Sequence, residues 1–481
     1  MVQKRTVLYF IALLLLFSAA VLVEAGTLRS LSAPGSDTWQ HLSSGIWAMQ
    51  HHVLPQLGQQ TLHPPSSHVS PCWLYDWQLA TAYQLLGLAV IPATQMTFQL
   101  SIALLTFLLA GGLYGRIWRA CALSVLAQYC ISSVYVVAGG CSMLLLATLV
   151  LLLVAARQSG NVKLFYWLPP IFLLWANVDF QFVYGIITLA LFTAASFTEE
   201  LCQIKGWGSA SKLPAKTIAI ALAASLAASF VTPTFFRSYE IFFARVSSPI
   251  NQYLKECDSM AFHRPQDYLV MLLVMGAFLS LGYRRTRMLA LPFILILATL
   301  WSFHARRDAW LVVIIALAVY GGEGADLPTV QRLYAVKRAG LQALASSMVV
   351  LVIAVALIPH KPSELLARAG KEYPVAAAEV IRSQHLPQPL FNALEWGGYL
   401  NWALSEYPVT YNSDTALYDE QMAVRYYRAM KVDDPPQQLA ELQNSATVLL
   451  PKSSILGQAL ANLPGYHTVY SDDVAILLVK N

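Results

Sequence analysis

Long apolar runs separated by short polar segments dominate the pattern along this chain. The first run, VLYFIALLLLFSAAVLV, follows MVQKRT and ends at Val23. Several later runs reach or approach the roughly 20 mostly apolar residues that a membrane-spanning helix needs, and together with the first run they predict about eleven spans. The other ten lie near residues 85–114, 120–138, 140–156, 164–178, 180–198, 217–235, 267–282, 288–304, 309–322 and 340–358. The sequence therefore predicts a polytopic α-helical membrane protein.

The positions of the basic residues predict the orientation of these spans. If the spans alternate in direction, nearly every basic cluster falls on one side, as the positive-inside rule requires. The clusters are Arg116 and Arg119; Arg157 and Lys163; Lys205, Lys212 and Lys216; Arg284, Arg285 and Arg287; and Arg332, Lys337 and Arg338. This orientation places the N-terminus in the cytoplasm and the loops 26–84 and 236–266 outside. The first run is either a retained helix or a cleaved signal peptide, and its near-spanning length favours a retained helix.

The pattern changes after the last apolar run. Short segments typical of strands and turns, such as ATVLLP and HTVYSDDVAILLVK, alternate with helical stretches such as EQMAVRYYRAM. We therefore expect a transmembrane domain over residues 1–359. A small extracytoplasmic α/β domain is expected over residues 360–481.

Composition supports a membrane protein and excludes one class of partner. Hydrophobic residues make up 57% of the 481 residues and charged residues only 12%, against about 25% charged in soluble domains. The net charge of +5 comes from the orienting clusters, and no Lys/Arg tract interleaved with aromatics predicts a nucleic-acid partner. None of the six cysteines has zinc-site or CxxC spacing. Cys72 and Cys257 are both predicted on the outer side, and the sequence leaves open whether they form a disulfide.

The first outer loop carries the first candidate chemistry. In GSDTWQHLSSGIWAMQHH, Trp39 and the apolar residues after it recur at helical spacing, which predicts an amphipathic helix lying in the membrane interface. Asp37 stands at its first turn. Asp37 either caps this helix, with Gln40 completing a near capping box, or is an ionised carboxylate held in one place. In the second case it acts as a base or binds a divalent cation.

Two more residues join Asp37 as candidate catalytic groups. His41 lies one helical turn further along, on the same face. Asp76, in CWLYDWQLA, stands at the other end of the loop, just before an apolar run. We expect the acids at the two ends of this loop to converge on one site at the membrane surface.

Several segments resemble one family. SDTWQHLSSGIWAMQHHVLP resembles the first outer loop of bacterial membrane proteins related to the GT-C glycosyltransferases, and CWLYDWQLATAYQLLG resembles the end of that loop. LLWANVDFQFVYG, SFVTPTFFRSYEIFFARVSSPINQYLKE and FNALEWGGYLNWAL with PVTYNSDTALYDEQ resemble later parts of the same proteins. The resemblance implies transfer of a sugar from a polyprenyl-phosphate carrier to an acceptor at the outer face of the bacterial inner (plasma) membrane. It assigns the role of base or metal ligand to Asp37, with Mg²⁺ or Mn²⁺ compatible but not required.

The sequence departs from this family at two positions. Asp179 stands where the resemblance leads us to expect a histidine after Asn177, and Asp414 lies in NSDTALY where a Gly-Arg is expected after the acid. These departures leave room for an altered acceptor, altered metal dependence or lost activity.

Arginines at an outer helix end are candidates for binding the donor phosphate. Arg306 and Arg307 lie outside, against the positive-inside trend, and arginine offers a bidentate fork to phosphate. The alternative is a snorkelling pair with Asp308 as partner. Arg237, in the later outer loop, is a weaker candidate for the same anion.

Four further residues are candidates for binding the acceptor or the sugar. Asn177 and Asp179 lie at an outer turn between two spans, where an ionisable group is either functional or simply hydrated. In EWGGYLNW, Glu395 and Trp396 precede two glycines that suit close backbone approach. An acid beside aromatics is typical of sugar sites, but Trp396 fits the core of the domain equally well.

The sequence as a whole favours a GT-C-type membrane glycosyltransferase, with Asp76 assisting Asp37 and Arg306 with Arg307 clamping the phosphate. The acceptor is a lipid, glycan or protein. Two alternatives stay open: a transporter or flippase of lipid-linked glycans, and a non-catalytic scaffold. The residues do not indicate the sugar, the acceptor or the oligomeric state.

Overall fold

The computed structural model divides the chain into two compact units. It describes residues 10–21, 37–58, 60–62, 69–112, 117–131, 138–205, 213–254, 257–283, 288–322, 341–342, 345–353, 356, 361–412, 420–433, 435 and 439–481. The first unit comprises residues 1–26, 93–239 and 254–358, and the second comprises 27–92, 240–253 and 359–481. The second unit thus contains the predicted tail domain together with much of the two predicted outer loops.

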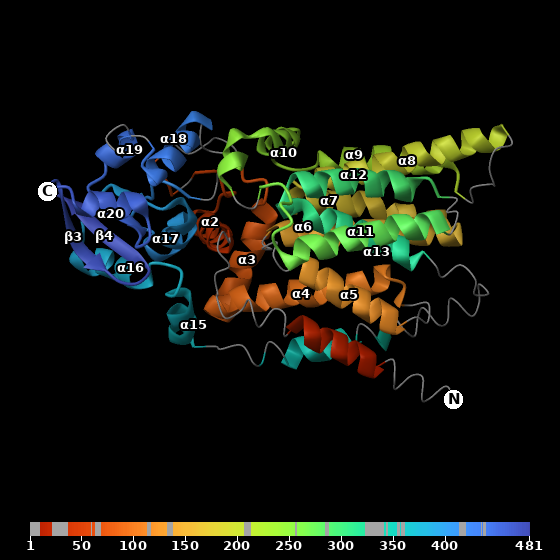
Figure 1. Cartoon of the computed structure of the whole chain (residues 1–481), viewed down its shortest axis with the longest axis horizontal. Coiled ribbons are helices and arrows are strands. Elements are labelled where there is room, and N and C mark those ends of the chain that lie inside the picture. The colour runs from red at the N-terminus through yellow and green to blue at the C-terminus, as the bar shows by residue number, and fades with distance from the viewer. Residues whose placement is uncertain are drawn as a thin grey trace. The chain divides into compact units, whose positions relative to one another are not determined.

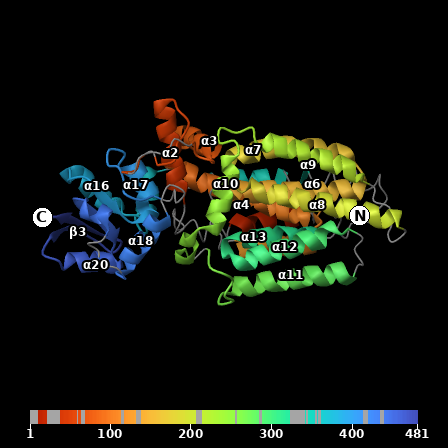
Figure 2. The ribbon, with the colours of Figure 1, turned by 90° about the horizontal axis from the view of Figure 1, so that it is seen from above.

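The first unit is a bundle of helices that run side by side (Figure 1, Figure 2). Its described helices are Phe10–Val21, α4 (Val90–Leu109), α5 (Ile117–Ile131), α6 (Ala138–Ser159), α7 (Leu168–Val178), α8 (Phe182–Ile204), α9 (Ala215–Ser229), α11 (Pro265–Tyr283), α12 (Ala290–His304) and α13 (Ala309–Gly321). The short 3-10 helices η3 (Val162–Trp167) and η5 (Arg306–Asp308) precede α7 and α13. Most of these helices coincide with the predicted spans, because each apolar run is long enough to form one helix.

Helix α13 lies at the centre of the bundle. All but one of its residues are buried, and none is charged, as expected for a helix that is apolar all round. Gly321 permits close packing at its end, because a Cβ there would lie 1.8 Å from the backbone oxygen of Leu109. A glycine at this position therefore brings α13 and α4 into backbone contact.

The described helices identify a multi-pass membrane protein. Four helical segments are long and apolar enough to cross a membrane: Trp73–Leu109, Gly139–Ser159, Phe182–Ile204 and Pro265–Tyr283. Five further apolar helices are shorter. On α11, Leu272, Met275 and Leu279 are exposed, which is how lipid-facing side chains look without a bilayer. The count of eleven spans stays a prediction.

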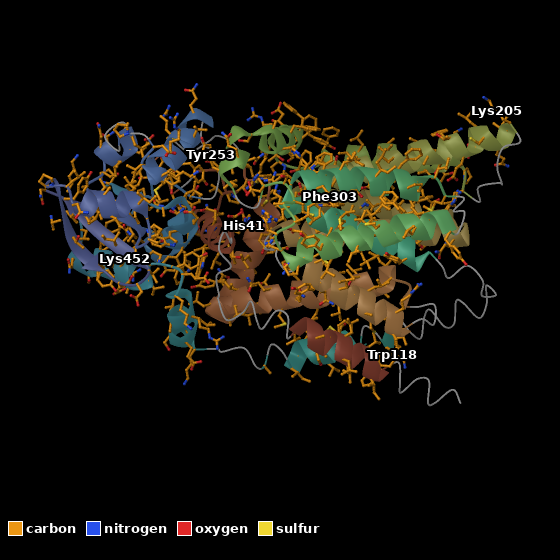
Figure 3. All side chains as sticks on the ribbon, in the orientation of Figure 1. His41, Trp118, Lys205, Tyr253, Phe303 and Lys452 are labelled. Atoms are coloured by element: carbon orange, nitrogen blue, oxygen red, sulfur yellow. The ribbon has the colours of Figure 1, made fainter. Side chains whose placement is uncertain are left out.

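Two residues from predicted inner and outer segments lie at different ends of the bundle. Lys205, at the end of α8, and Trp118, on α5, lie toward one end, and Phe303 lies toward the other (Figure 3). Arg306 follows Phe303 closely in the chain, so it lies at the end opposite Lys205. Lys205 and Arg306 therefore lie at opposite ends of the bundle, and the orientation of the bundle in the membrane stays a prediction.

The second unit contains a four-stranded sheet of order β1-β2-β4-β3. The strands are β1 (Leu390–Asn392), β2 (Thr447–Pro451), β3 (Tyr466–Ser471) and β4 (Ala475–Lys480). β1 pairs parallel to β2, and the other pairs are antiparallel. The central strands β2 and β4 read as nearly continuous buried apolar runs, which is typical of strands covered on both faces.

Helices complete the second unit. They are α2 (Thr38–His51), α3 (Trp73–Leu86), α10 (Arg237–Ser247, which begins in the first unit), α15 (Pro362–Ala369), α16 (Val375–Gln384), α17 (Gly397–Ala403), α18 (Glu420–Lys431), α19 (Ala440–Gln443) and α20 (Ile455–Ala461), with the 3-10 helices η1 (Gly87–Ala89), η4 (Pro249–Tyr253) and η7 (Leu394–Trp396). The predicted helix in EQMAVRYYRAM is confirmed by α18.

The EWGGYLNW stretch is helical rather than a strand or turn. Each of its two glycines lies directly against the backbone of another segment of the chain. A Cβ on Gly397 would lie 2.0 Å from the oxygen of Tyr411, and one on Gly398 would lie 2.6 Å from the nitrogen of Gln40. The predicted close backbone approach is therefore confirmed, but it occurs in the first turn of α17 and not in a loop.

Trp39 does not face outward from α2 as an anchor in the membrane interface would, and the interfacial position of α2 itself stays a prediction. Trp39 is only 2% exposed, and its ring packs against Tyr399 and Trp402 of α17 at centroid distances of 5.2 and 4.9 Å. The apolar face that periodicity detects therefore covers α17, a helix more than 300 residues further along the chain.

Candidate functional site

Asp37 occupies the position just before α2 but does not cap it. The Asp37 side chain makes no capping hydrogen bond to the helix, although its backbone oxygen accepts from the N–H of His41 at 2.9 Å. The capping-box interpretation is therefore wrong. The Asp37 carboxylate is therefore not used to cap the first turn of α2 and is available for another role.

His41 and Asp76 meet across the α2–α3 interface. The Nδ1 of His41 lies 2.5 Å from Oδ1 of Asp76, and the Asp76 side chain is only 1% exposed. The ring of Tyr75 packs edge-on to the His41 ring at 5.1 Å. Two of the three residues predicted from the outer loop are therefore in contact, and Asp37 is one helical turn away.

A carboxylate that accepts from Nδ1 determines the tautomer of a neutral histidine. The proton then resides on Nδ1, and Nε2 is left as a proton acceptor. The His41 side chain is 15% exposed, so the ring is not sealed from solvent as Asp76 is. In this pair a buried acid orients an imidazole, which is the arrangement expected of a histidine that acts as a general base.

Tyr373 lies close enough to Asp37 to sense its charge. Burial raises the pKa of the Tyr373 hydroxyl, and the negative charges of Asp37 and Glu372 raise that pKa further. Tyr373 also packs against Trp39, with ring centroids 6.0 Å apart. The Tyr373 hydroxyl therefore stays protonated.

The arginine pair of the first unit is divided between different partners. The Nη2 of Arg306 lies 3.8 Å from Oδ2 of the buried Asp267, a distance too long for a hydrogen bond. Arg307 donates from Nη1 to Sγ of Cys257 at 3.1 Å, and its Nε lies 4.0 Å from Asp308. The predicted pairing with Asp308 thus applies to Arg307, whereas Arg306 faces Asp267.

Arg264 joins Arg306 at Asp267, and sequence reasoning missed it. Its Nη2 lies 3.8 Å from Oδ1 of the same carboxylate. The Nε and Nη2 of Arg264 and the Nε of Arg306 are buried and donate no hydrogen bond within the described part of the chain. The signal in the sequence was a third arginine on the predicted outer loop 236–266, after Arg237 and Arg245, against the positive-inside trend. Two guanidinium groups sharing one carboxylate leave net positive charge and unused donors, as an anion site requires.

Asn177 and Asp179 are engaged in contacts within the bundle. The amide of Asn177 donates to the backbone oxygens of Leu173 and Val231 at 2.8 and 2.9 Å. Asp179 is 2% exposed and accepts from the hydroxyl of Ser142 at 2.6 Å. The alternative that Asp179 is simply hydrated is therefore wrong, because the carboxylate is buried. Its predicted role in binding acceptor or sugar stays a prediction.

Glu395 and Trp396 point to different environments. The Glu395 residue is exposed, whereas Trp396 is only 6% exposed and donates from Nε1 to the backbone oxygen of Glu372 at 3.0 Å. Trp396 therefore belongs to the domain core, which leaves its ring no face for a sugar. Desolvation nevertheless raises the pKa of the Glu395 carboxyl, and Glu395 remains a candidate group.

The remaining predicted residues fall into three cases. Arg237 begins α10 with its side chain exposed. Asp414 lies outside the described residues. Cys72 and Cys257 belong to different units, so a disulfide between them stays a prediction.

In the described part of the chain, no group of three or more His, Cys, Asp or Glu side chains is arranged to hold a metal ion.

Similarity to solved structures identifies the architecture. The chain is similar to the Archaeoglobus fulgidus oligosaccharyltransferase tethered to an acceptor peptide, with a TM-score of 0.55 and 12% identity over 91% of this chain and 69% of that one. The chain has a GT-C-like fold. It is also similar to ArnT from Cupriavidus metallidurans bound to undecaprenyl phosphate, with a TM-score of 0.48 and 14% identity over 96% and 97% of the two chains.

The GT-C-like fold agrees with the family resemblance seen in the sequence. The sequence matches no protein-family model and no curated protein.

Proposed function

We propose that this GT-C-like protein transfers a sugar from a polyprenyl-phosphate donor to a lipid, glycan or protein acceptor at the outer face of a bacterial inner membrane. The observation that carries the proposal is the carboxylate of Asp37, which is not used as a cap and begins the helix that brings His41 to Asp76. A helix cap alone would not require a buried acid to hold a histidine one turn away.

The reaction needs a group that accepts a proton and a group that stabilises a leaving phosphate. The acceptor oxygen attacks the anomeric carbon while its proton passes to a base of the Asp37, His41 and Asp76 group. The bond between that carbon and the donor phosphate oxygen breaks, and the phosphate leaves with the electron pair. Positive charge at the leaving phosphate is the largest expected contribution to catalysis.

The arginines supply that charge in the proposal. Arg306 and Arg307 were predicted for this role, and the unused donors of Arg306 and Arg264 support an anion beside Asp267. Arg307 contributes less directly, since its guanidinium already contacts Cys257 and Asp308. We keep the exposed Arg237 as a further candidate for binding the donor phosphate.

A divalent cation is compatible with this chemistry but is assigned no step. Asp37 is the residue that would bind Mg²⁺ or Mn²⁺, and either ion would add positive charge near the leaving phosphate. Because the described residues contain no larger cluster of metal-ligating side chains, the proposal relies on the arginines for charge neutralisation.

The test is a mass-spectrometric comparison of envelope glycans and glycolipids. A strain lacking the gene is restored with the wild type, with Asp37→Asn, or with Asp473→Asn, which removes an exposed carboxylate on the β3–β4 turn. We expect a sugar to disappear on deletion and to return with the wild type and Asp473→Asn only. Full restoration by Asp37→Asn would remove Asp37 from the mechanism. An unchanged glycan profile on deletion would favour the scaffold or the transporter.

A further inference from the structure

The α2–α3 interface contains a stripe of residues spaced one helical turn apart. His41, Gly45 and Met49 follow each other at intervals of four on α2. On α3 they meet Asp76, then Ala80, and then Thr81, whose hydroxyl lies 4.0 Å from the sulfur of Met49. The two helices therefore pack along each other over this stripe, and the His41–Asp76 contact lies at one end of the stripe.

At Gly45 the backbone of α2 lies close against the backbone of α3. A Cβ at residue 45 would lie 2.1 Å from the backbone oxygen of Asp76, 2.7 Å from its carbonyl carbon and 2.9 Å from Cβ of Ala80. Two of these three atoms belong to the backbone, which cannot rotate away as a long side chain can. Any side chain at residue 45 therefore requires α2 and α3 to separate locally.

The separation that a methyl group imposes is large enough to break the contact with His41. Real Cβ atoms essentially never approach a neighbour closer than 3.0 Å, so the helices must move apart by about 1 Å. Asp76 is the residue displaced, and its Oδ1 now lies 2.5 Å from Nδ1 of His41. A displacement of about 1 Å takes this contact to the limit at which a hydrogen bond is lost.

We propose that Gly45 is a positioning residue for His41. By bringing the backbone of Asp76 against α2, it holds the buried carboxylate at Nδ1 and leaves Nε2 as the proton acceptor. The inference deepens the proposed function, on which it rests, by assigning proton acceptance within the Asp37, His41 and Asp76 group to His41. The proton of the acceptor hydroxyl then moves to Nε2, and Asp76 stabilises the imidazolium that results.

The test compares Gly45→Ala with two controls in the full-length chain. Gly370→Ala adds the same methyl group where the nearest atoms lie 3.4 Å or more away. Leu450→Ala removes a fully buried side chain of β2 and lowers the melting temperature without touching α2 or α3. A misplacement of about 1 Å is expected to reduce sugar transfer by about 100-fold. We expect this loss in Gly45→Ala but not in Leu450→Ala, measured well below both melting temperatures.

A second readout does not depend on transfer. In detergent-solubilised protein with ¹⁵N-labelled histidine, the Nδ1 proton of His41 should give a strongly hydrogen-bonded NMR signal, assigned by its loss in His41→Gln. The signal should shift in Gly45→Ala and stay unchanged in Gly370→Ala and Leu450→Ala. An unchanged His41 signal in Gly45→Ala overturns the proposal, even if transfer falls. If the wild type transfers no sugar, the proposed function fails while this signal still decides whether Gly45 positions His41.

A double variant covers the case in which Gly45→Ala does not accumulate. Gly45→Ala with Ala80→Gly relieves the side-chain contact but leaves the closer one with the Asp76 backbone. Because one of the three close contacts is removed, this variant should accumulate better than Gly45→Ala, and because the Asp76 backbone contact remains, we expect the His41 signal still to be shifted. Recovery of the wild-type signal would show that the Asp76 backbone does not determine the register, which overturns the proposal.

Discussion

His41 and Asp76 are 35 positions apart in the sequence, and their side chains meet at 2.5 Å between Nδ1 and Oδ1. Asp76 is almost completely buried while His41 retains some exposure. The acid therefore cannot reach a substrate directly, and its effect must pass through the imidazole. This division of roles, a buried orienting acid and a more accessible base, was not evident when both residues were simply candidates on one loop.

Replacing either member of this pair should reduce sugar transfer. His41→Gln removes the proton acceptor, and Asp76→Asn removes the charge that stabilises an imidazolium, so each should reduce transfer by about 100-fold to 10,000-fold. Product is measured by mass spectrometry in the restored deletion strain. Protein level and melting temperature are followed in parallel, because Asp76 is buried. The double variant should be little worse than His41→Gln alone, since Asp76 acts through His41. Additive losses would contradict that order of action.

Substitutions around Asp267 should change the binding of inorganic pyrophosphate in opposite directions. Arg264→Ala and Arg306→Ala each remove a charged donor, for which a hydrogen bond contributes about 1.5–3 kcal/mol, so affinity should fall about 10-fold to 150-fold. Asp267→Asn should raise affinity, because the carboxylate repels the anion. The measurement is isothermal calorimetry on solubilised protein.

Two arginines serve as comparisons for that experiment. Arg307→Ala should have a smaller effect than Arg306→Ala, because the Arg307 guanidinium already contacts Cys257 and Asp308. Arg425→Ala removes an exposed arginine from α18 and should have no effect. Equal losses for Arg425 and Arg306 would indicate nonspecific attraction of the anion by the positive net charge.

Glu199, near the end of α8, should contribute strongly to the stability of the bundle. Its Oε2 pairs with Arg157 of α6, and its Oε1 accepts from the backbone N–H of Leu289 at 2.7 Å, just before α12. Removing one partner of a fully buried ion pair costs about 3–5 kcal/mol, and this pair is partly buried, so Glu199→Ala should lower the melting temperature by an amount below that limit. Glu199→Gln should cost less, since its amide oxygen can still accept from Leu289. A double-mutant cycle with Arg157→Ala measures the pair itself.

Asp472 should make the stability of the second unit depend on pH in acid. Desolvation opposes ionisation of this carboxyl, but hydrogen bonds from the N–H groups of Ala475 and Val474 and the hydroxyl of Tyr470 outweigh it and lower its pKa. A pKa lower in the folded than in the unfolded state stabilises the protein above the unfolded value, about 3.9. This contribution disappears as pH falls through the folded pKa.

The measurement for Asp472 is thermal unfolding of the wild type and Asp472→Asn across the acid range. The wild type should be more stable at neutral pH, and the difference should shrink as the carboxyl is protonated. Asp473→Asn, one residue away, is the matched control and should show no such trend. A constant difference between the wild type and Asp472→Asn at all pH values would contradict the assignment.

Local pattern was sufficient for the elements of this fold, because each apolar run forms a helix from its own residues. It also identified Asp37, His41 and Asp76, since acids and a histidine beside apolar helices are unusual wherever they pack. It failed where a partner lies far away in the sequence. The periodicity revealed the apolar face of α2 that contains Trp39, so Trp39 was interpreted as an anchor in the membrane interface. It could not reveal that α17 covers this face. Arg264 was missed for the same reason, since nothing near it in the sequence points to Asp267 as a carboxylate shared with Arg306.

The sequence by itself determined that the chain is a multi-pass helical membrane protein with a small α/β tail, and it selected the loops that carry the candidate residues. These properties depend on local hydrophobicity and charge, which the chain carries at every position. Only the tertiary structure decided that α2 packs on both α3 and α17, that His41 meets Asp76, and that Arg306 shares Asp267 with Arg264. Those relationships depend on approaches of a few ångströms between distant segments, made possible by glycines such as Gly45 and Gly398, and no periodicity in the sequence encodes which backbone will lie against them.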